Sequence, residues 1–150
     1  MKRGLCIASV AFCILTCWAA ASFAGFSLPP EVYRIGSLKE AQDKARSTNV
    51  PMVFIYSDET SSCGLARAAT LDVIGELKGD ALIIYVSRND SARIPRDVIK
   101  AMNSPAAGKF IPKSVVVNPR TNKVEMIIPY ISDRNRRIEE IRKVKGVIGK

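Results

Sequence analysis

One short stretch of the chain combines residue types that could do chemistry, Ser61-Ser62-Cys63-Gly64-Leu65-Ala66-Arg67. It lies between an apolar run that is typical of a strand and a run with helical periodicity, so we expect Cys63 at the N-terminus of a helix. The free backbone N–H groups and the positive end of the helix dipole at such a position favour the thiolate, which is the nucleophilic form of cysteine. Ala66 stands where a C-x-x-C motif would carry its second cysteine. The sequence therefore predicts one reactive thiol without an adjacent partner.

The first 24 residues are typical of a secretory signal peptide. Met1-Lys2-Arg3 is basic, residues 5–21 are almost wholly apolar, and Ser22-Phe23-Ala24 has small residues at the two positions that a signal peptidase reads. We therefore expect cleavage near Ala24 and export, to the periplasm or out of the cell. A membrane anchor formed by the same apolar residues and lipidation at Cys17 are the alternatives.

Cleavage would leave Cys63 as the single cysteine of the mature chain, because Cys6, Cys13 and Cys17 lie in the signal segment. A single cysteine in an exported protein is buried and inert, paired with another molecule, or a reactive free thiol. The chain has no histidine, which makes a zinc site or a catalytic triad untenable. We expect no metal and no cofactor.

The charge of the mature chain is strongly positive. Removal of Lys2 and Arg3 lowers the formal net charge from +9 to +7. Such a chain is expected to adhere weakly to anionic surfaces, while export argues against nucleic acid as a partner. Most of the cations in the last 20 residues are expected to form a solvated helix face that Glu139 and Glu140 relieve.

The elements that must position Cys63 alternate along the chain. Residues 25–36 predict an extended lead-in, and the folded domain is expected over residues 37–150. Its helices are predicted at 37–49, where Ser37 and Glu40 form a capping box, and at 64–78, 95–102 and 133–145. In the last of these, Asp133 is the expected cap, and Ile138, Ile141 and Val144 are expected to face inward.

Strands are predicted at 52–56, 81–86, 115–117 and 124–128, and residues 87–91 are expected to form a polar turn. Alternation of strands with helices implies parallel strands joined by crossovers, and the final hairpin implies an antiparallel edge. The expected architecture is an α/β fold with a mixed central sheet and helices on both faces.

Three pieces of this order resemble the thioredoxin fold family, over about residues 37–146. Residues 51–57 resemble the central strand that precedes the active site. Cys63-Gly64-Leu65-Ala66-Arg67 resembles the family's C-G-x-C-K, with alanine in place of the second cysteine and arginine in place of lysine. Phe110-Ile111-Pro112-Lys113 resembles the loop whose proline is cis. The resemblance implies a thioredoxin-like three-layer sandwich and a cis Ile111–Pro112 bond.

The resemblance also implies a site and a reaction. Cys63 would exchange with disulfides, while Arg67 and the helix dipole stabilise its negative charge. Gly64, Ile111 and Pro112 would line the groove that holds an extended peptide substrate. Because no second cysteine can release the mixed disulfide from within, a thiol from glutathione or another protein would have to resolve it.

Two alternatives remain open from the sequence. The chain could be a binding or structural module of the same fold in which Cys63 is a remnant packed against the sheet, since fold does not imply function. Thr60-x-x-Cys63 also resembles the T-x-x-C of peroxiredoxins, which would imply peroxide reduction, although Tyr56 stands where that pattern begins with proline.

Overall fold

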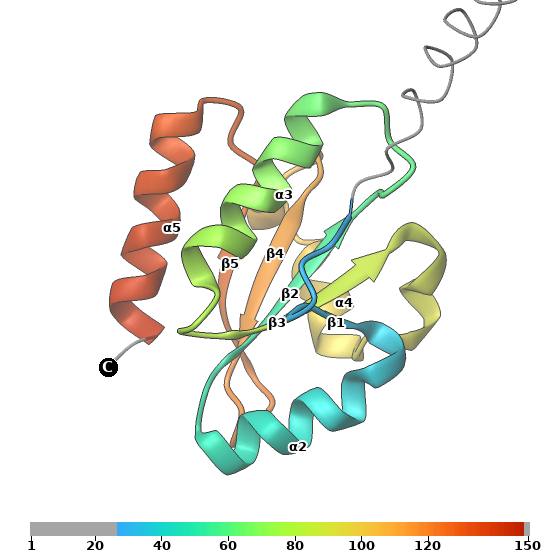
Figure 1. Cartoon of the computed structure of the whole chain (residues 1–150), viewed down its shortest axis with the longest axis vertical. Helices are drawn as coiled ribbons and strands as arrows, with labels where there is room; N and C mark the ends of the chain where they lie inside the picture. Colours follow the sequence, from blue (N-terminus) through green and yellow to red (C-terminus); the bar gives the residue numbers. More distant parts are fainter. Residues whose placement is uncertain (1–26, 149–150) are drawn as a thin grey trace, which may run out of the picture.

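The strands of the computed structural model form one mixed five-stranded sheet in the order β1-β3-β2-β4-β5 (Figure 1). The structure describes residues 27–148, so the predicted signal segment and its cleavage site lie outside the described residues. β2 and β3 run parallel, and β4 and β5 continue the sheet as an antiparallel hairpin, as the sequence predicts. β1, which the sequence does not predict, adds a further parallel strand beside β3. The strands are β1 (Tyr33–Arg34), β2 (Met52–Ser57), β3 (Leu82–Ser87), β4 (Lys113–Val117) and β5 (Val124–Ile128).

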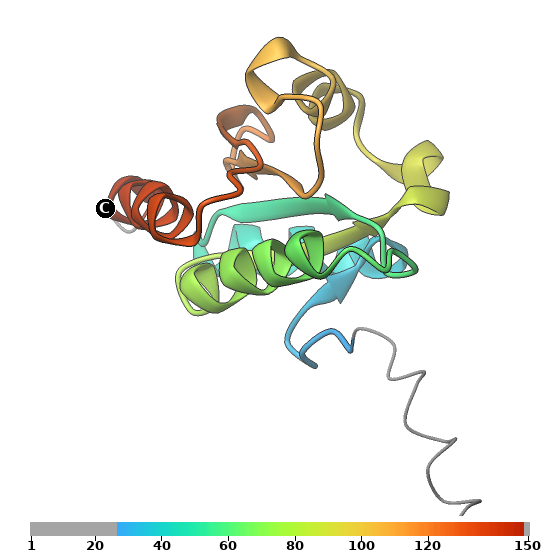
Figure 2. The same cartoon turned by 90° about the horizontal axis from the view of Figure 1, so that it is seen from above.

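Helices cover both faces of this sheet, which gives the expected three layers. The α-helices are α2 (Leu38–Thr48), α3 (Gly64–Leu77), α4 (Arg96–Met102) and α5 (Arg134–Ile148), and the 3-10 helices are η1 (Ile35–Ser37), η2 (Arg88–Arg93) and η3 (Pro105–Ala107). α3 and α5 share one core with the sheet, and α2 and α4 share the other. Seen from above, α3 in green and α4 in yellow lie on opposite sides of the strands (Figure 2).

The central strand β2 is buried on both faces because its apolar run is continuous. Successive side chains of a strand point to opposite faces. Val53 and Ile55 therefore pack in the core under α3 and α5, while Met52 and Phe54 pack in the core under α2 and α4. This burial fixes the direction in which the chain leaves the sheet at Ser57, six residues before Cys63.

α5 is attached to α3 by a buried ion pair. Arg137 is only 5% exposed, and its Nη2 lies 2.5 Å from Asp72 Oδ2. Its Nη1 also donates to the carbonyl oxygens of Ile131 and Ser132, at 2.6 and 3.1 Å. Arg134 reaches the other oxygen of the Asp72 carboxylate at 3.4 Å. Each polar atom of this group is thereby paired, as burial of a charge requires.

Acidic residues of α3 and of the turn after it, rather than those of α5, compensate most of the α5 cations. The interhelical pairs beyond Arg137 are Arg142 with Glu76 at 3.1 Å and Lys145 with Asp80 at 2.9 Å. Within residues 27–148, Glu139 and Glu140 pair only with Lys143. The prediction that these two residues relieve the basic helix was therefore wrong for most of it. The reason is that α5 packs beside α3, whose acids recur every four residues on the facing side.

Three local predictions need correction. Residues 25–36 are not simply an extended lead-in, because β1 pairs with β3 and η1 follows it. Ser37 makes no side-chain hydrogen bond to α2 within the described range, because it ends η1 and a backbone bond from Leu38 to Ile35 closes that turn. Residues 88–93 form η2 rather than an open turn.

The inward face of α5 also differs from the prediction at one position. Ile141 and Val144 are buried as expected, whereas Ile138 is half-buried and lines the groove between α3 and α5. The reason is that Arg137, the residue before Ile138, occupies the interface, where its guanidinium pairs with the Asp72 carboxylate. The cap is as predicted, since the Arg136 N–H donates to Asp133 Oδ1 at 2.8 Å.

Candidate functional site

Cys63 is the N-cap residue of α3, and its thiol is free and exposed. β2 ends at Ser57, and a loop of five residues carries the chain to Cys63 at the start of the helix. The Cys63 N–H donates to Ser61 Oγ at 3.2 Å. Among the described residues, no side chain caps the first turn of α3, so the helix presents backbone N–H groups toward the thiol end. The predicted placement of Cys63 at a helix N-terminus is confirmed.

A buried hydrogen-bond cluster fixes this first turn to the sheet. Thr70 Oγ1 lies 2.9 Å from the Ala66 carbonyl oxygen and 3.0 Å from Ser57 Oγ. Thr70, Ala66 and Ser57 are all buried. The end of β2 and the first turn of α3 are therefore joined directly beneath the exposed Cys63. Ala66, which stands in the place of a resolving cysteine, forms part of this buried layer.

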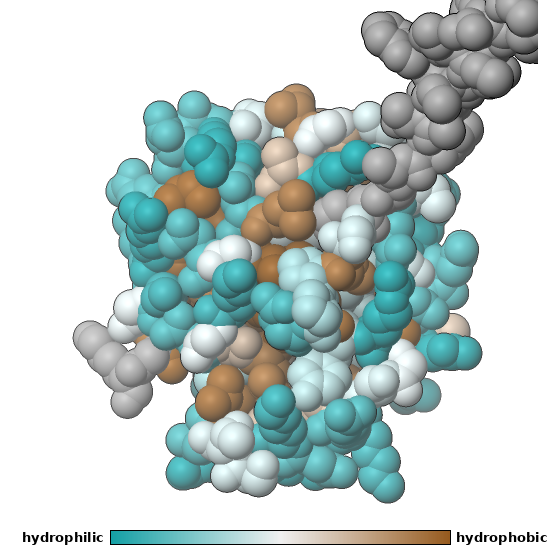
Figure 3. Space-filling view, in the orientation of Figure 1, coloured by the Kyte–Doolittle hydropathy of each residue, from teal (hydrophilic) through white to brown (hydrophobic). Residues whose placement is uncertain are grey.

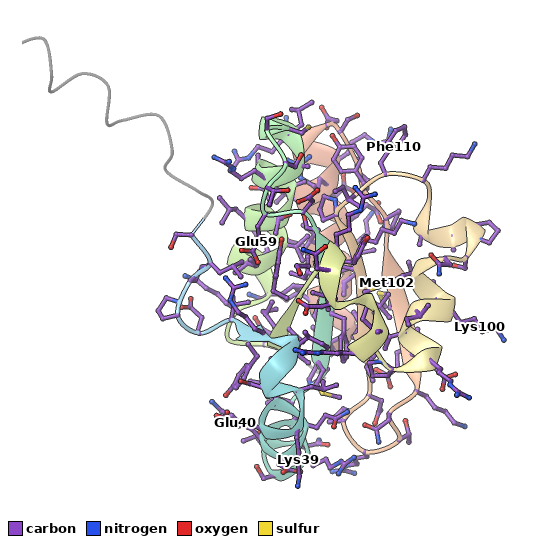
Figure 4. All side chains as sticks on the ribbon, turned by 90° about the vertical axis from the view of Figure 1, so that its right-hand side faces the viewer. Lys39, Glu40, Glu59, Lys100, Met102 and Phe110 are labelled. Atoms are coloured by element: carbon purple, nitrogen blue, oxygen red, sulfur yellow. The ribbon has the colours of Figure 1, made fainter. Side chains whose placement is uncertain are left out.

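The loop before Cys63 is held by its two acidic residues. Asp58 Oδ1 accepts hydrogen bonds from the Thr60 hydroxyl at 2.6 Å and from the Thr60 N–H at 2.9 Å. These two bonds hold the pKa of Asp58 below its ordinary value. Glu59 pairs with Arg34 of β1, with Oε1 2.6 Å from Nη1, and this bond raises the pKa of the Arg34 guanidinium. Sequence reasoning missed this pair, because it joins residues 25 positions apart. Figure 4 labels Glu59 on this loop.

We expect the Asp58 contacts to stabilise the fold above pH 4 and to fail in acid. Since the pKa of Asp58 is lower in the folded chain, the contribution is complete above its unfolded pKa of about 3.9 and is lost as the pH falls through the folded value. The free energy of unfolding of Asp58→Asn, compared with that of the natural chain, should differ by a constant amount above about pH 5 and by progressively less below pH 4. Chemical denaturation at each pH measures this difference.

The matched control for that prediction is Thr60→Ala. In a chain without the Thr60 hydroxyl, Asp58→Asn should lose part of its pH-dependent effect, because one of the two donors that lower the pKa is gone while the Thr60 N–H remains. An unchanged effect in the Thr60→Ala background would assign the stabilisation to the Thr60 N–H or to another group.

Arg67 lies one turn into α3, and its N–H donates to the Cys63 carbonyl oxygen at 3.2 Å. Its side chain is exposed and makes no ion pair with any residue between 27 and 148. Positions i and i+4 share one face of a helix. The guanidinium is therefore free to act on charge at Cys63, although the structure gives no contact between the two side chains.

The second segment predicted for the site approaches the same end of the sheet. The Ile111–Pro112 bond is cis, as predicted. Pro112 is buried and Ile111 half-buried, and both come directly before β4. Because β4 is antiparallel to β2, with Lys113 opposite Tyr56, this loop and the loop that leads to Cys63 leave the sheet at the same edge.

Two exposed apolar side chains were not predicted at this end of the molecule. Leu65, in the first turn of α3, is 62% exposed, and Phe110 is 70% exposed. The Phe110 ring packs edge-on against Tyr130, with centroids 6.2 Å apart. Phe110 lies at the end of the molecule where α3 begins (Figure 4), and apolar side chains appear over α3 in the surface view (Figure 3). In the sequence, only the closeness of Leu65 to Cys63 and of Phe110 to Ile111 indicates that these two side chains belong to the site.

The described residues form neither a candidate metal site nor a candidate membrane span. Between residues 27 and 148, no three His, Cys, Asp or Glu residues are grouped so that they could hold a metal ion. In the same range, no helix has both the length and the apolar character needed to cross a bilayer.

No protein-family model and no curated protein sequence matches the chain, whereas solved structures do. A disulphide isomerase from Xylella fastidiosa superposes with a TM-score of 0.52 at 13% identity, over 78% of this chain and 95% of the isomerase. Thioredoxin O2 from Arabidopsis thaliana superposes with a TM-score of 0.51 at 15% identity, over 80% of this chain and 96% of the thioredoxin. Similarity at this level of identity carries the fold alone. The mixed sheet, its two helical layers and these superpositions show that the chain has a thioredoxin-like fold.

Proposed function

We propose that this protein is an exported monothiol protein that exchanges thiols and disulfides through Cys63. The observation that carries the proposal is the free, exposed thiol at the N-terminal end of α3. The chain shares its fold with a disulphide isomerase and with a thioredoxin, and this similarity also supports thiol–disulfide exchange. Fold alone does not fix activity, so the weight rests on the exposed thiol.

The reaction needs one thiolate and one disulfide. The Cys63 sulfur attacks one sulfur of the substrate disulfide, a new S–S bond forms between them, and the second substrate sulfur leaves as a thiolate. Arg67 and the helix N-terminus would stabilise the negative charge on Cys63 before attack. Since Ala66 supplies no second thiol, the adduct waits for an external thiol, from glutathione or from another protein, to reduce it.

A peptide substrate would lie along the loop before β4. In this proposal its extended backbone pairs with Ile111, beside the buried Pro112, and its disulfide approaches Cys63 over Gly64. Gly64 has open space where a side chain would begin, so the approach over it is not obstructed. The exposed Leu65 and Phe110 would contact apolar residues of the peptide.

Export is the second part of the proposal. Its support is the basic start, the apolar run and the small residues up to Ala24. After cleavage the chain would carry one cysteine into a compartment where disulfides persist. Mass determination of the protein recovered from its host would give a chain that begins near Gly25, or an intact N-terminus that refutes cleavage and favours the membrane anchor.

Two observations count against the alternatives for Cys63, the packed remnant and peroxide reduction. The exposed thiol contradicts the hypothesis that Cys63 is a remnant packed against the sheet. The peroxide hypothesis needs the Thr60 hydroxyl to face the thiol, but that hydroxyl is bonded to Asp58 at 2.6 Å.

The experiment is to incubate the folded mature chain with a peptide disulfide and follow its mass. We expect one covalent adduct per chain, its absence in Cys63→Ser, and its removal by added glutathione. A chain that stays unmodified while it remains folded would refute thiol–disulfide exchange. Consumption of hydrogen peroxide with no adduct from disulfides would support the peroxide alternative instead.

A further inference from the structure

A polar recess of about 500 Å³ lies beside the loop that carries Cys63. Its lining comes from the carboxyl ends of all three parallel strands: Arg34 ends β1, Asp58 follows β2, and Arg88 follows β3. In sheets with parallel strands, this edge is the place where ligands bind. The site described above uses the neighbouring loops and leaves this recess unused.

The charges that line the recess fall into two groups. Glu59 and Arg34 neutralise each other in a pair of hydrogen bonds at 2.6 and 3.3 Å. Asp58 and Arg88 make no ion pair with each other or with another residue in the described range. Both hydrogen bonds that Asp58 accepts from Thr60 go to Oδ1, so Oδ2 can accept from a ligand. Arg88 is exposed, and its side chain makes no ion pair with any residue that the structure describes, so its N–H donors can reach a ligand.

A carboxylate and a guanidinium that line one recess without closing on each other suit a zwitterion. An ion of a single sign would meet one attractive and one repulsive charge there. The ammonium group of an α-amino acid can donate to Asp58 Oδ2, while its carboxylate accepts from Arg88 and from the side-chain amide of Asn89, which also lines the recess. An aspartate is ionised at neutral pH, and the hydrogen bonds from Thr60 lower the pKa of Asp58 further.

We propose that this recess binds the α-amino-acid end of a low-molecular-mass disulfide and presents its sulfur to Cys63. The inference rests on the proposed thiol–disulfide exchange and names a substrate class for it, which oxidised glutathione and cystine share. The Ser61 N–H donates to the Asp58 carbonyl oxygen at 3.3 Å, and such a turn brings the Cα atoms of these two residues within about 7 Å of each other. The two further residues to Cys63 add at most about 7 Å, so the Cα atoms of Asp58 and Cys63 are at most about 14 Å apart. The γ-glutamylcysteine arm of glutathione has a length of about two residues, or about 7 Å, which together with the two side chains covers that span.

The step is an exchange of one disulfide for another. The Cys63 thiolate bonds to the sulfur of the bound half, the original S–S bond breaks, and the second half leaves as a thiolate. No further oxidant or reductant takes part. The thiol that leaves takes up a proton from water according to the pH.

The test compares second-order rates of adduct formation on Cys63 for three disulfides: oxidised glutathione, cystine and uncharged 2-hydroxyethyl disulfide. We expect Arg88→Gln and Asp58→Asn each to slow the two zwitterionic reagents about tenfold, since each removes a charged hydrogen bond. The rate of Arg88→Gln with 2-hydroxyethyl disulfide should stay within about twofold of that of the natural chain, because this reagent has no charge for Arg88 to bind. Arg120→Gln, an exposed residue of the β4–β5 turn, controls for the loss of one positive charge.

Each outcome is decisive. If Arg88→Gln slows all three reagents alike, or none, or no more than Arg120→Gln does, the recess does not select the zwitterion and this inference fails while thiol–disulfide exchange stands. If the natural chain forms no adduct with any reagent, the proposed function itself fails. A loss with oxidised glutathione but not with cystine assigns the recess to the longer γ-glutamyl arm.

Discussion

Replacing Ala66 by cysteine is expected to make Cys63 release the adduct that the natural chain retains. With an aromatic disulfide reagent, the natural chain should release one equivalent of the aromatic thiol and keep the other half bound. Ala66→Cys should release two equivalents, because the new thiol attacks the adduct and closes an internal disulfide. The positions are the N-cap and the third residue of α3, one turn apart on the same side, which is within the span of a disulfide. Absorbance of the released thiol measures the stoichiometry.

The matched control is Ala66→Ser, which has nearly the same size and no nucleophilic sulfur. It should behave as the natural chain and release one equivalent. Because residue 66 is buried, circular dichroism must first show that both variants are folded. One equivalent from folded Ala66→Cys would mean that position 66 cannot reach the Cys63 sulfur, and the assignment of Ala66 to the resolving position would be wrong.

Replacing Arg137 by methionine is expected to lower the free energy of unfolding by about 3 kcal/mol. The Arg137 side chain is 6% exposed and that of Asp72 12%, so the substitution leaves a carboxylate in a mostly buried place. It also leaves the carbonyl oxygens of Ile131 and Ser132 without the donor that they have now. Arg134 retains one contact with Asp72 at 3.4 Å. The expected decrease in the free energy of unfolding is therefore near the lower end of the range for broken buried ion pairs. Urea denaturation measures the change.

Arg142→Met is the comparison on the same interface. Its partner Glu76 is bonded at 3.1 Å, but the Arg142 side chain is 66% exposed, and an exposed pair contributes less than about 1 kcal/mol. Asp72→Asn combined with Arg137→Met should recover part of the loss, because the buried carboxylate is then neutral. Equal effects of Arg137→Met and Arg142→Met would show that burial of the ion pair does not govern the attachment of α5.

Several elements could be predicted because their signals are local. The run from Met52 to Tyr56 is apolar at every position, which is typical of a strand buried on both faces, and β2 is buried from Met52 to Ile55. The start of α3 at Cys63 follows from the change from a polar loop to helical spacing. The cis Ile111–Pro112 bond, by contrast, was implied by the family resemblance, since the residues alone favour a trans bond.

The rest depends on contacts between distant residues, which no local pattern shows. β1 has two residues, too few for alternation to be visible, and it exists because β3 offers an open edge. The pairs Glu59–Arg34 and Asp72–Arg137 join residues 25 and 65 positions apart, so their choice of partner is set by the tertiary fold. The recess at Asp58 and Arg88 is defined by strand order, for which no local pattern of residues is a signal.

The central claim is that Cys63 is an exposed nucleophile in the folded chain, and one rate comparison tests it most directly. The mature chain is treated with a small disulfide reagent at neutral pH, once folded and once in denaturant, and adduct formation on Cys63 is followed in time. We predict that the folded chain reacts about tenfold faster than the denatured one, because α3 stabilises the attacking thiolate only when it is formed. A thiol that reacts more slowly when folded, or only after unfolding, would contradict the account and leave this fold with a binding role.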